Sequence, residues 1–249
     1  GVERRENALD LQCGGGMALG IVTYVYKPDN AEVTQISRLS IDVGIGTAFT
    51  GDLLSINLSN VHLFVGSGAG DFNYSSEGLL TGIKDANGTS VTNANTTATG
   101  FSVSGASVKV AIITDPDAAA TSPTPRSFTG VAASIDTVDL VGFDDTLTLR
   151  VKELNILMNI GFTNSDNTNI VTKLDWDELT NVSDNGVSGF ESLDKTLDLQ
   201  VGGGLELGID TYVKLAGDFE VTQKTGLSIN DGVETAFTGD QPSMILHTV

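Results

Sequence analysis

The feature that most constrains this chain is an internal repeat. Residues 9–52 read LDLQCGGGMALGIVTYVYKPDNAEVTQISRLSIDVGIGTAFTGD, and residues 197–240 read LDLQVGGGLELGIDTYVKLAGDFEVTQKTGLSINDGVETAFTGD. The two segments align from end to end without a gap, and 27 of the 44 aligned positions are identical. Repeats of this kind fold into like units that stabilise one another by contact. The sequence therefore predicts one repeat unit over residues 1–196, starting near Leu9, and the beginning of the next over residues 197–249.

The first part of the repeat has the period of a β-strand. From Leu197 to Val213, apolar side chains take most of the odd-numbered positions, and polar residues and glycines take most of the even-numbered positions. This period of two predicts a strand with one buried, apolar face and one solvated face. Gly202–Gly204 lies in the middle, where missing side chains permit a bend, a bulge or a close backbone approach. No helix follows these glycines, so they do not indicate a phosphate-binding loop.

Between the copies, similar alternation recurs in strand-length segments, and it is strongest over residues 101–113, 131–143 and 147–162. The phase slips by one residue at Lys152–Glu153, which predicts a β-bulge. Residues 66–99 are rich in Gly, Ser, Asn and Thr and predict a surface excursion. No window predicts an amphipathic helix. The predicted fold class is all-β, an elongated repeat architecture of long bulged strands, arranged as an extended antiparallel sheet or sandwich or, alternatively, as a β-solenoid.

The charge of the chain excludes several kinds of partner. With 13 basic and 32 acidic residues, the formal net charge is −19. Such a chain repels nucleic acid and anionic membrane surfaces, and it attracts hard cations such as calcium. No apolar stretch approaches the ~20 residues of a membrane-spanning helix. A membrane barrel is also disfavoured, because aromatic residues are only 6% of the chain and form no paired girdles. We therefore predict no membrane insertion.

Clustered carboxylates in the predicted loops are the candidate metal ligands. Calcium binds six to eight oxygen atoms, which neighbouring loops can supply together. The candidates are Asp175, Asp177 and Glu178, which form the strongest cluster, then Asp115 and Asp117, and then Asp144 and Asp145. None of them has the spacing of an EF-hand loop. The alternative is that they are solvated turn residues. Calcium is the one cofactor that the sequence suggests.

The residue types needed for catalysis are scarce. His62 and His247 are the two histidines and Cys13 is the single cysteine, which is too few for a zinc site or a catalytic triad. His62 lies in a predicted strand and is expected to face solvent, whereas Cys13 is expected to be a small core residue. We predict that the chain is not an enzyme. The catalytic alternative is a polysaccharide-active β-helix with a pair of carboxylates in a groove.

Several short phrases in the strands are built from the same few residue types. They are FEVTQ at 219–223, GASV at 105–108, RSFT at 126–129 and VDLVG at 138–142. In long alternating strands, they resemble the tandem β-repeats of giant bacterial extracellular proteins of the LEPR-XLL, haemagglutinin-like and RTX-adhesin type. The GGxGxD nonapeptide of RTX blocks does not occur in the sequence. The resemblance implies a surface or matrix location and a structural or adhesive role, with no catalytic residues.

These observations together favour a mechanical function. We predict a structural repeat module of a very large secreted or surface-attached bacterial protein, which forms a rod, fibre or matrix element. Its partners would be neighbouring copies of the same repeat, which bury the apolar strip by packing on one another, so self-assembly is expected. The alternative is an adhesin stalk or binding module, stiffened by calcium, in which loops such as 66–99 bind a surface glycan or protein.

Overall fold

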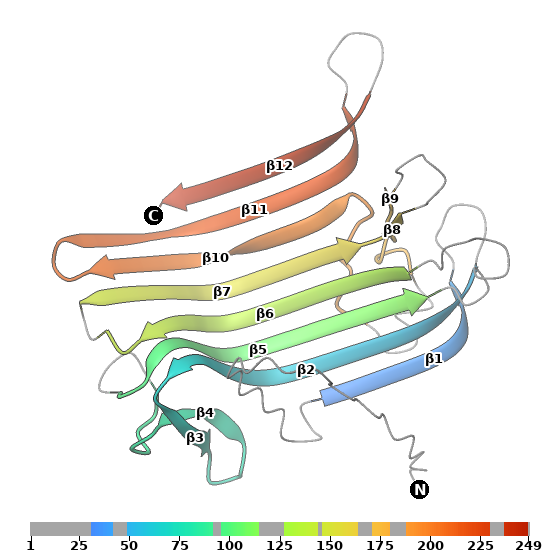
Figure 1. Ribbon diagram of the computed structural model, residues 1–249. Helices are drawn as coiled ribbons and strands as arrows, with labels where there is room; N and C mark the ends of the chain where they lie inside the picture. Colours follow the sequence, from blue (N-terminus) through green and yellow to red (C-terminus); the bar gives the residue numbers. More distant parts are fainter. Residues whose placement is uncertain are drawn as a thin grey trace, which may run out of the picture.

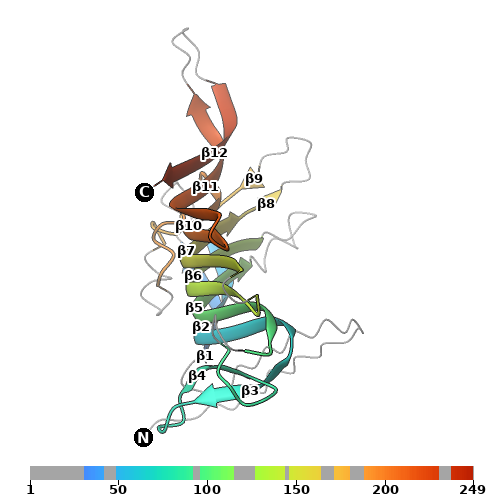
Figure 2. The ribbon, with the colours of Figure 1, turned by 90° about the vertical axis from the view of Figure 1, so that its left-hand side faces the viewer.

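The computed structural model describes residues 31–41, 49–91, 96–114, 127–143, 146–163, 171–179, 188–229 and 237–248. Its main element is an antiparallel sheet of eight strands in a single layer (Figures 1 and 2). In spatial order they are β1 (Ala31–Ile41), β2 (Phe49–Ser67), β5 (Thr99–Thr114), β6 (Ser127–Val141), β7 (Leu147–Ile160), β10 (Leu197–Ile209), β11 (Val213–Ile229) and β12 (Phe237–Thr248). Two further pairs are β3 (Ala69–Tyr74) with β4 (Leu80–Asp85), and β8 (Phe162–Thr163) with β9 (Val171–Thr172).

The prediction of an all-β fold with long antiparallel strands is confirmed. The alternative of a β-solenoid is wrong for the described residues, because each long strand pairs with neighbours that run in the opposite direction. Strands that follow one another in the main sheet also lie side by side, as short connections between antiparallel strands favour. Among the described residues, no helix is long and apolar enough to cross a membrane.

The two copies of the repeat pair their strands in the same register. The β1–β2 pair of the first copy corresponds to the β11–β12 pair of the second. All nine residue pairs between β1 and β2 recur at the aligned positions of β11 and β12. Both pairs contain a bulge at the same place, where Arg38 has φ 58° and Gly226 has φ 71°. The segment that matches β10 in the first copy, Leu9–Ile21, lies outside the described residues.

A line of irregular residues crosses the middle of the sheet. The bulge predicted at Lys152–Glu153 is confirmed, because Glu153 has φ 52° and the β7–β10 register shifts beside it. Asn60 in β2 (φ 52°) and Gly105 in β5 (φ 65°) adopt the same left-handed conformation. An extra residue in a strand reverses the alternation of its side chains. The apolar residues on both sides of this line consequently face the same side of the sheet.

Two pieces of chain pack against one face of the sheet, which we call the covered face. Residues 173–179 and 188–197 cover one end, where Trp176, Leu179 and Leu193 meet Ile113 and Phe128 of the sheet in a buried cluster. The β3–β4 hairpin covers the other end in a second cluster. That cluster joins Phe64 and Val141 of the sheet to Ile83, Val91 and Ala98 of the hairpin and its flanks. The opposite face is called the open face below.

Candidate functional site

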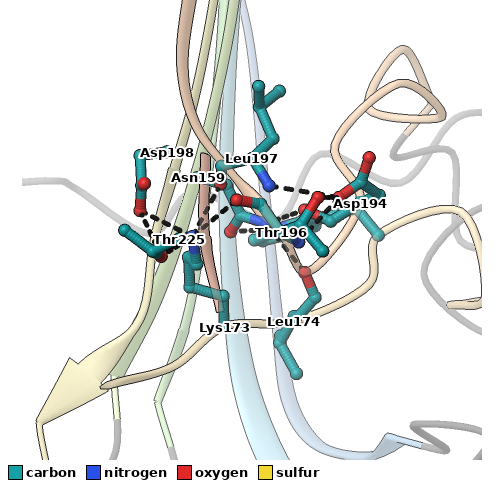
Figure 3. A network of polar contacts seen from close by, with 9 residues as sticks. Asn159, Lys173, Leu174, Asp194, Thr196, Leu197, Asp198 and Thr225 are labelled. Carbon is teal, nitrogen blue, oxygen red and sulfur yellow. Dashed lines mark hydrogen bonds and ion pairs between the residues drawn. The ribbon is translucent and has the colours of Figure 1, made fainter. Parts of the chain in front are cut away.

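The segment that covers one end of the sheet is fastened by a buried lysine. The Nζ atom of Lys173 donates hydrogen bonds to the carbonyl oxygens of Thr196 (3.1 Å) and Leu197 (3.2 Å). It also contacts Asp198 Oδ1 at 2.5 Å and donates to Thr225 Oγ1 at 2.8 Å (Figure 3). The Lys173 side chain is only 3% exposed. Since a buried charge needs partners, these four acceptors fix the segment to β10 and β11.

A second set of contacts fastens the same segment to β7. The amide nitrogen of Asn159 donates to the carbonyl oxygens of Leu174 and Asp194, both at 2.8 Å, and its amide oxygen accepts from Trp176 Nε1 at 3.0 Å. Burial opposes ionisation of Asp194, but bonds from the hydroxyl and N–H of Thr196 together with the Lys224 charge lower its pKa. We call Asn159, Lys173, Asp194, Asp198 and Thr225 the clasp. Its groups bond one another and the backbone, as expected of a structural joint.

The strongest predicted calcium cluster lies within this covering segment. Burial raises the pKa of Asp175, and the negative charges of Glu178 and Asp194 raise it further. Asp177 and Glu178 are exposed. Among the described residues, no group of three or more His, Cys, Asp or Glu side chains is arranged to hold a metal ion. The other candidates, Asp115, Asp117, Asp144 and Asp145, lie outside the described residues, so calcium binding stays a prediction.

The expectation that His62 faces solvent is wrong. Its side chain lies on the covered face beneath the β3–β4 hairpin, and the residue is 7% exposed. Nε2 lies 3.1 Å from Asn60 Oδ1, while Nδ1 is buried without a hydrogen-bond partner. Burial lowers the pKa of His62, and the charge of Asp136 partly offsets that effect. Asn60 in turn donates to the Leu80 carbonyl oxygen at 3.1 Å. These contacts belong to the packing of the hairpin, and Cys13 lies outside the described residues.

The glycine triplet lies below an open groove on the covered face. The groove has a volume of ≈ 420 Å³, and its lining includes Glu153, Asp218 and Glu220 beside the three glycines. The predicted close approach is confirmed at Gly203, where an added Cβ atom would lie 2.9 Å from the Lys152 carbonyl oxygen. Glycine is thus needed where β10 passes the bulge of β7. The groove carries carboxylates and glycine backbone, but no described histidine or cysteine that could act as a nucleophile or base.

The two faces of the sheet differ sharply in chemistry. One row of residues crosses all eight strands on the open face and is entirely apolar: Ala31, Leu58, Val108, Ala133, Ile156, Val201, Val221 and Met244. The adjacent row on the covered face is mostly polar: Glu32, Asn57, Lys109, Ala132, Leu157, Gln200, Thr222 and Ser243. Large side chains on the open face reach solvent, with Val33 53%, Ile160 47% and Met244 74% exposed.

This arrangement corrects one expectation and adds residues that the sequence did not point to. We expected the apolar face of the strands to be buried. Within one chain, however, the apolar face of the central strands is the one that is exposed to solvent. The reason is that the covering segments carry their own apolar residues, such as Trp176 and Leu193, and pack over the ends of the other face. The clasp was not predicted. Its one signal in the sequence is Asn159, a polar residue within a strongly apolar strand.

No protein-family model, curated protein or solved structure matches this chain. The features that bear on its function are therefore the repeat, the clasp, the edges of the sheet and its open face.

Proposed function

We propose that this chain is a structural repeat module of a very long extracellular or cell-surface protein, in which successive units join edge to edge into a continuous β-sheet. The observation that carries the proposal is the shared register of β1–β2 and β11–β12. Because the copies are equivalent, a strand like β10 can pair with the outer edge of β1, as β10 itself pairs with β11. Likewise, β12 offers the position that β5 fills beside β2. The extracellular location is proposed from the resemblance to giant bacterial repeat proteins.

The contacts between the first unit and the second copy support this joining. β7 is the last long strand of the first unit and β10 is the first strand of the second copy. Arg150 of β7 lies 2.5 Å from Asp139 of β6 and 3.5 Å from Glu206 of β10, and Lys152 also pairs with Glu206. Asp139, Arg150 and Glu206 lie directly across from one another in the sheet and favour the pairing of three strands. The hydrogen bonds and positive charges of Lys152 and Arg150 also lower the pKa of Glu206.

The clasp crosses the same boundary. Lys173 belongs to the first unit, whereas Asp198 and Thr225 belong to the second copy. The first copy has equivalent acceptors in its sequence, because Asp10 and Ser37 occupy the aligned positions. The acceptor side of this joint is thus present in both copies. A preceding unit with a lysine like Lys173 could be fastened to this chain in the same way.

The geometry predicts how such an array would grow. One period of the repeat contributes six strands, from β2 to β11, before the pattern restarts at β12. With a spacing of ~4.8 Å between strands, each unit would lengthen the sheet by about 29 Å. A twist of about 20–25° per strand would turn it by roughly 120–150°. The result would be a long, twisted ribbon.

The experiment that tests the proposal adds one unit to the chain. Residues 49–52 and 237–240 are both FTGD, so a second copy of residues 53–240 can be inserted after Asp240 with native sequence at each junction. We expect small-angle X-ray scattering to show a larger radius of gyration and a greater longest dimension in the extended chain, because the sheet becomes about 29 Å wider across its strands. A folded extended chain whose longest dimension is unchanged would show that the added unit packs on a face of the sheet and does not widen it. That result would contradict the proposal.

A further inference from the structure

We propose that the open face is an interface whose partner is the open face of a second copy of this sheet. Two copies would pack face to face about 10 Å apart, like the layers of a β-sandwich. The proposed function uses the edges of the sheet, whereas this inference uses a face that edge-to-edge joining leaves bare. The two proposals therefore stand or fall separately.

The chemistry of the open face fits an apolar partner. Its central rows run across the strands without a charged residue, as in Val33, Ile56, Val110, Val131, Met158 and Leu199, which occupy six adjacent strands. The charged side chains of the central strands, such as Lys109, Arg150 and Glu206, lie on the covered face. Monomeric proteins rarely expose an apolar patch larger than a few hundred Å². The open face far exceeds that limit.

The area of the face is sufficient for a stable dimer. The eight strands have 11–19 residues. With ~4.8 Å between strands and ~3.4 Å per residue, a length of about 12 residues, near the short end of that range, gives roughly 1,600 Å² for one copy. Two flat faces would bury about 3,000 Å² in total. If the twist of the sheets limited contact to half of that area, the interface would still reach the ~1,600 Å² that is usual for specific protein complexes.

Two other occupants fit the face less well. The longest stretch of chain outside the described residues is residues 1–30. A stretch of this length could lie along two of the eight strands at most. An acyl chain or other small apolar ligand needs a concave site that encloses most of its surface. Four hollows among the described residues lie on the covered face, beside Glu220, Phe64, Ser55 and Ser134. A second apolar sheet meets the requirement for a broad partner, and a two-fold axis would pair each face with itself.

The test uses the full chain and two neighbouring positions on opposite faces of β6. Ala133 lies in the central row of the open face, and Ser134 is exposed on the covered face. Sedimentation equilibrium should show a dimer for the unchanged chain and for Ser134→Asp. Ala133→Asp should raise the dimer dissociation constant at least ~100-fold, because each copy would bury an unpaired carboxylate. Circular dichroism and Trp176 fluorescence would confirm that both variants are folded.

A measurement on the unchanged chain does not depend on any variant. Met158 lies in the centre of the open face, whereas Met244 lies at its β12 edge. Oxidation of Met158 by dilute peroxide should slow several-fold as protein concentration rises through the dimerisation range. Equal oxidation rates of Met158 at all concentrations would overturn the inference even if Ala133→Asp failed to fold.

The remaining outcomes each overturn the face-to-face dimer in a distinct way. A monomer that floats with phosphatidylcholine vesicles would show that the face binds lipid. A monomer that does not bind vesicles would show that the face has no partner of either kind. Oligomers that persist in Ala133→Asp with Met158 still reactive would show association through the edges, which supports the proposed function alone. The dimer test and the unit-insertion test can also disagree. If the dimer behaves as expected but the chain with an added unit is no longer than before, the interface is supported and the edge-to-edge array is contradicted.

Discussion

Replacing Lys173 with methionine should detach the covering segment from the sheet more than any other single polar change in the clasp. The side chain is 3% exposed, and its ammonium group contacts two carbonyl oxygens, the Thr225 hydroxyl and the Asp198 carboxylate. Methionine retains most of the apolar stem but removes every one of these donors. The Asp198 carboxylate, whose Oδ2 atom is already buried without a partner, would then lose its counter-charge.

The size of the effect follows from the burial of the pair. Removing one partner from a fully buried ion pair costs about 3–5 kcal/mol. Because the Asp198 side chain is 24% exposed, water can solvate it in part, and we expect a loss of about 2–3 kcal/mol. Removing both charges in Lys173→Met/Asp198→Leu leaves no unpaired carboxylate. The double variant should therefore recover at least ~1 kcal/mol relative to Lys173→Met.

The assay is equilibrium unfolding in urea, followed by tryptophan emission and by circular dichroism. Trp176 is the single tryptophan and lies buried in the covering segment, so its emission reports that segment while circular dichroism reports the sheet. In Lys173→Met, the emission should change at a lower urea concentration than the circular dichroism. Lys109→Met is the matched control, because among the described residues Lys109 donates one hydrogen bond, to the Ser188 carbonyl oxygen, and its loss should cost less than ~1 kcal/mol. A loss below ~1 kcal/mol in Lys173→Met, or additive effects in the double variant, would refute the reasoning.

Other positions give sharp expectations. Gly130→Ala should destabilise the chain by about 1–3 kcal/mol in urea unfolding, because its Cβ atom would lie 2.9 Å from the Trp176 ring; an unchanged midpoint would contradict this contact. Arg38→Gly should stabilise it by up to ~1 kcal/mol, since Arg38 has φ 58° and the second copy has Gly226 at the equivalent position, and a loss of stability would count against that equivalence. Four hydrogen bonds to Asp85 lower its pKa to about 2, so its contribution to stability is present above pH ~4 and is lost as the pH falls toward 2. Unfolding at several pH values should therefore show Asp85→Asn to be less stable than the unchanged chain at neutral pH, with a difference that shrinks as the pH falls through about 2, and a constant difference would contradict it.

The strands could be predicted from the sequence because their signal is local. Alternation over residues 147–162 predicts both β7 and its bulge, since a slip in phase can be read without knowing the partner strand. The repeat predicts that two parts of the chain are alike, and the equal registers of β1–β2 and β11–β12 agree with this. The glycine triplet predicts a bend, a bulge or a close approach, and the structure shows a close approach to the Lys152 carbonyl oxygen.

The clasp and the buried side of the sheet could not be predicted in the same way, because both depend on contacts between distant residues. Lys173 meets Asp198 and Thr225 across 25 and 52 residues, and nothing in the local sequence marks the three as partners. Alternation shows that a strand has two unlike faces, but it does not show which face another part of the chain will cover. Here a few apolar residues around Trp176 determine which face is covered, and they cover the less apolar face of the strands.

The outer edge of β12 differs from that of β2 in a way that bears on how an array would end. Leu53 of β2 is 1% exposed in the main cluster, and Leu54 pairs with Ile112 of β5. At the equivalent positions β12 has Gln241 and Pro242, both exposed. Proline lacks an N–H donor and is found on edge strands. Burying a glutamine side chain in place of leucine costs free energy, because its polar group loses water. We infer that β12 is a poorer template for a further strand than β2 is.

This difference can be tested in a chain whose face-to-face pairing is removed. In an Ala133→Asp background, Gln241→Leu/Pro242→Leu should restore the residues of β2 and promote association through the β12 edge, seen as a concentration-dependent rise in sedimentation coefficient. Gln241→Asn is the matched control, because it keeps a polar side chain and the proline and should leave the chain monomeric. If the Leu-Leu variant stays monomeric wherever the control does, the two residues do not limit growth of the sheet. In that case the edge would have to be blocked by the shape of the twisted strand itself.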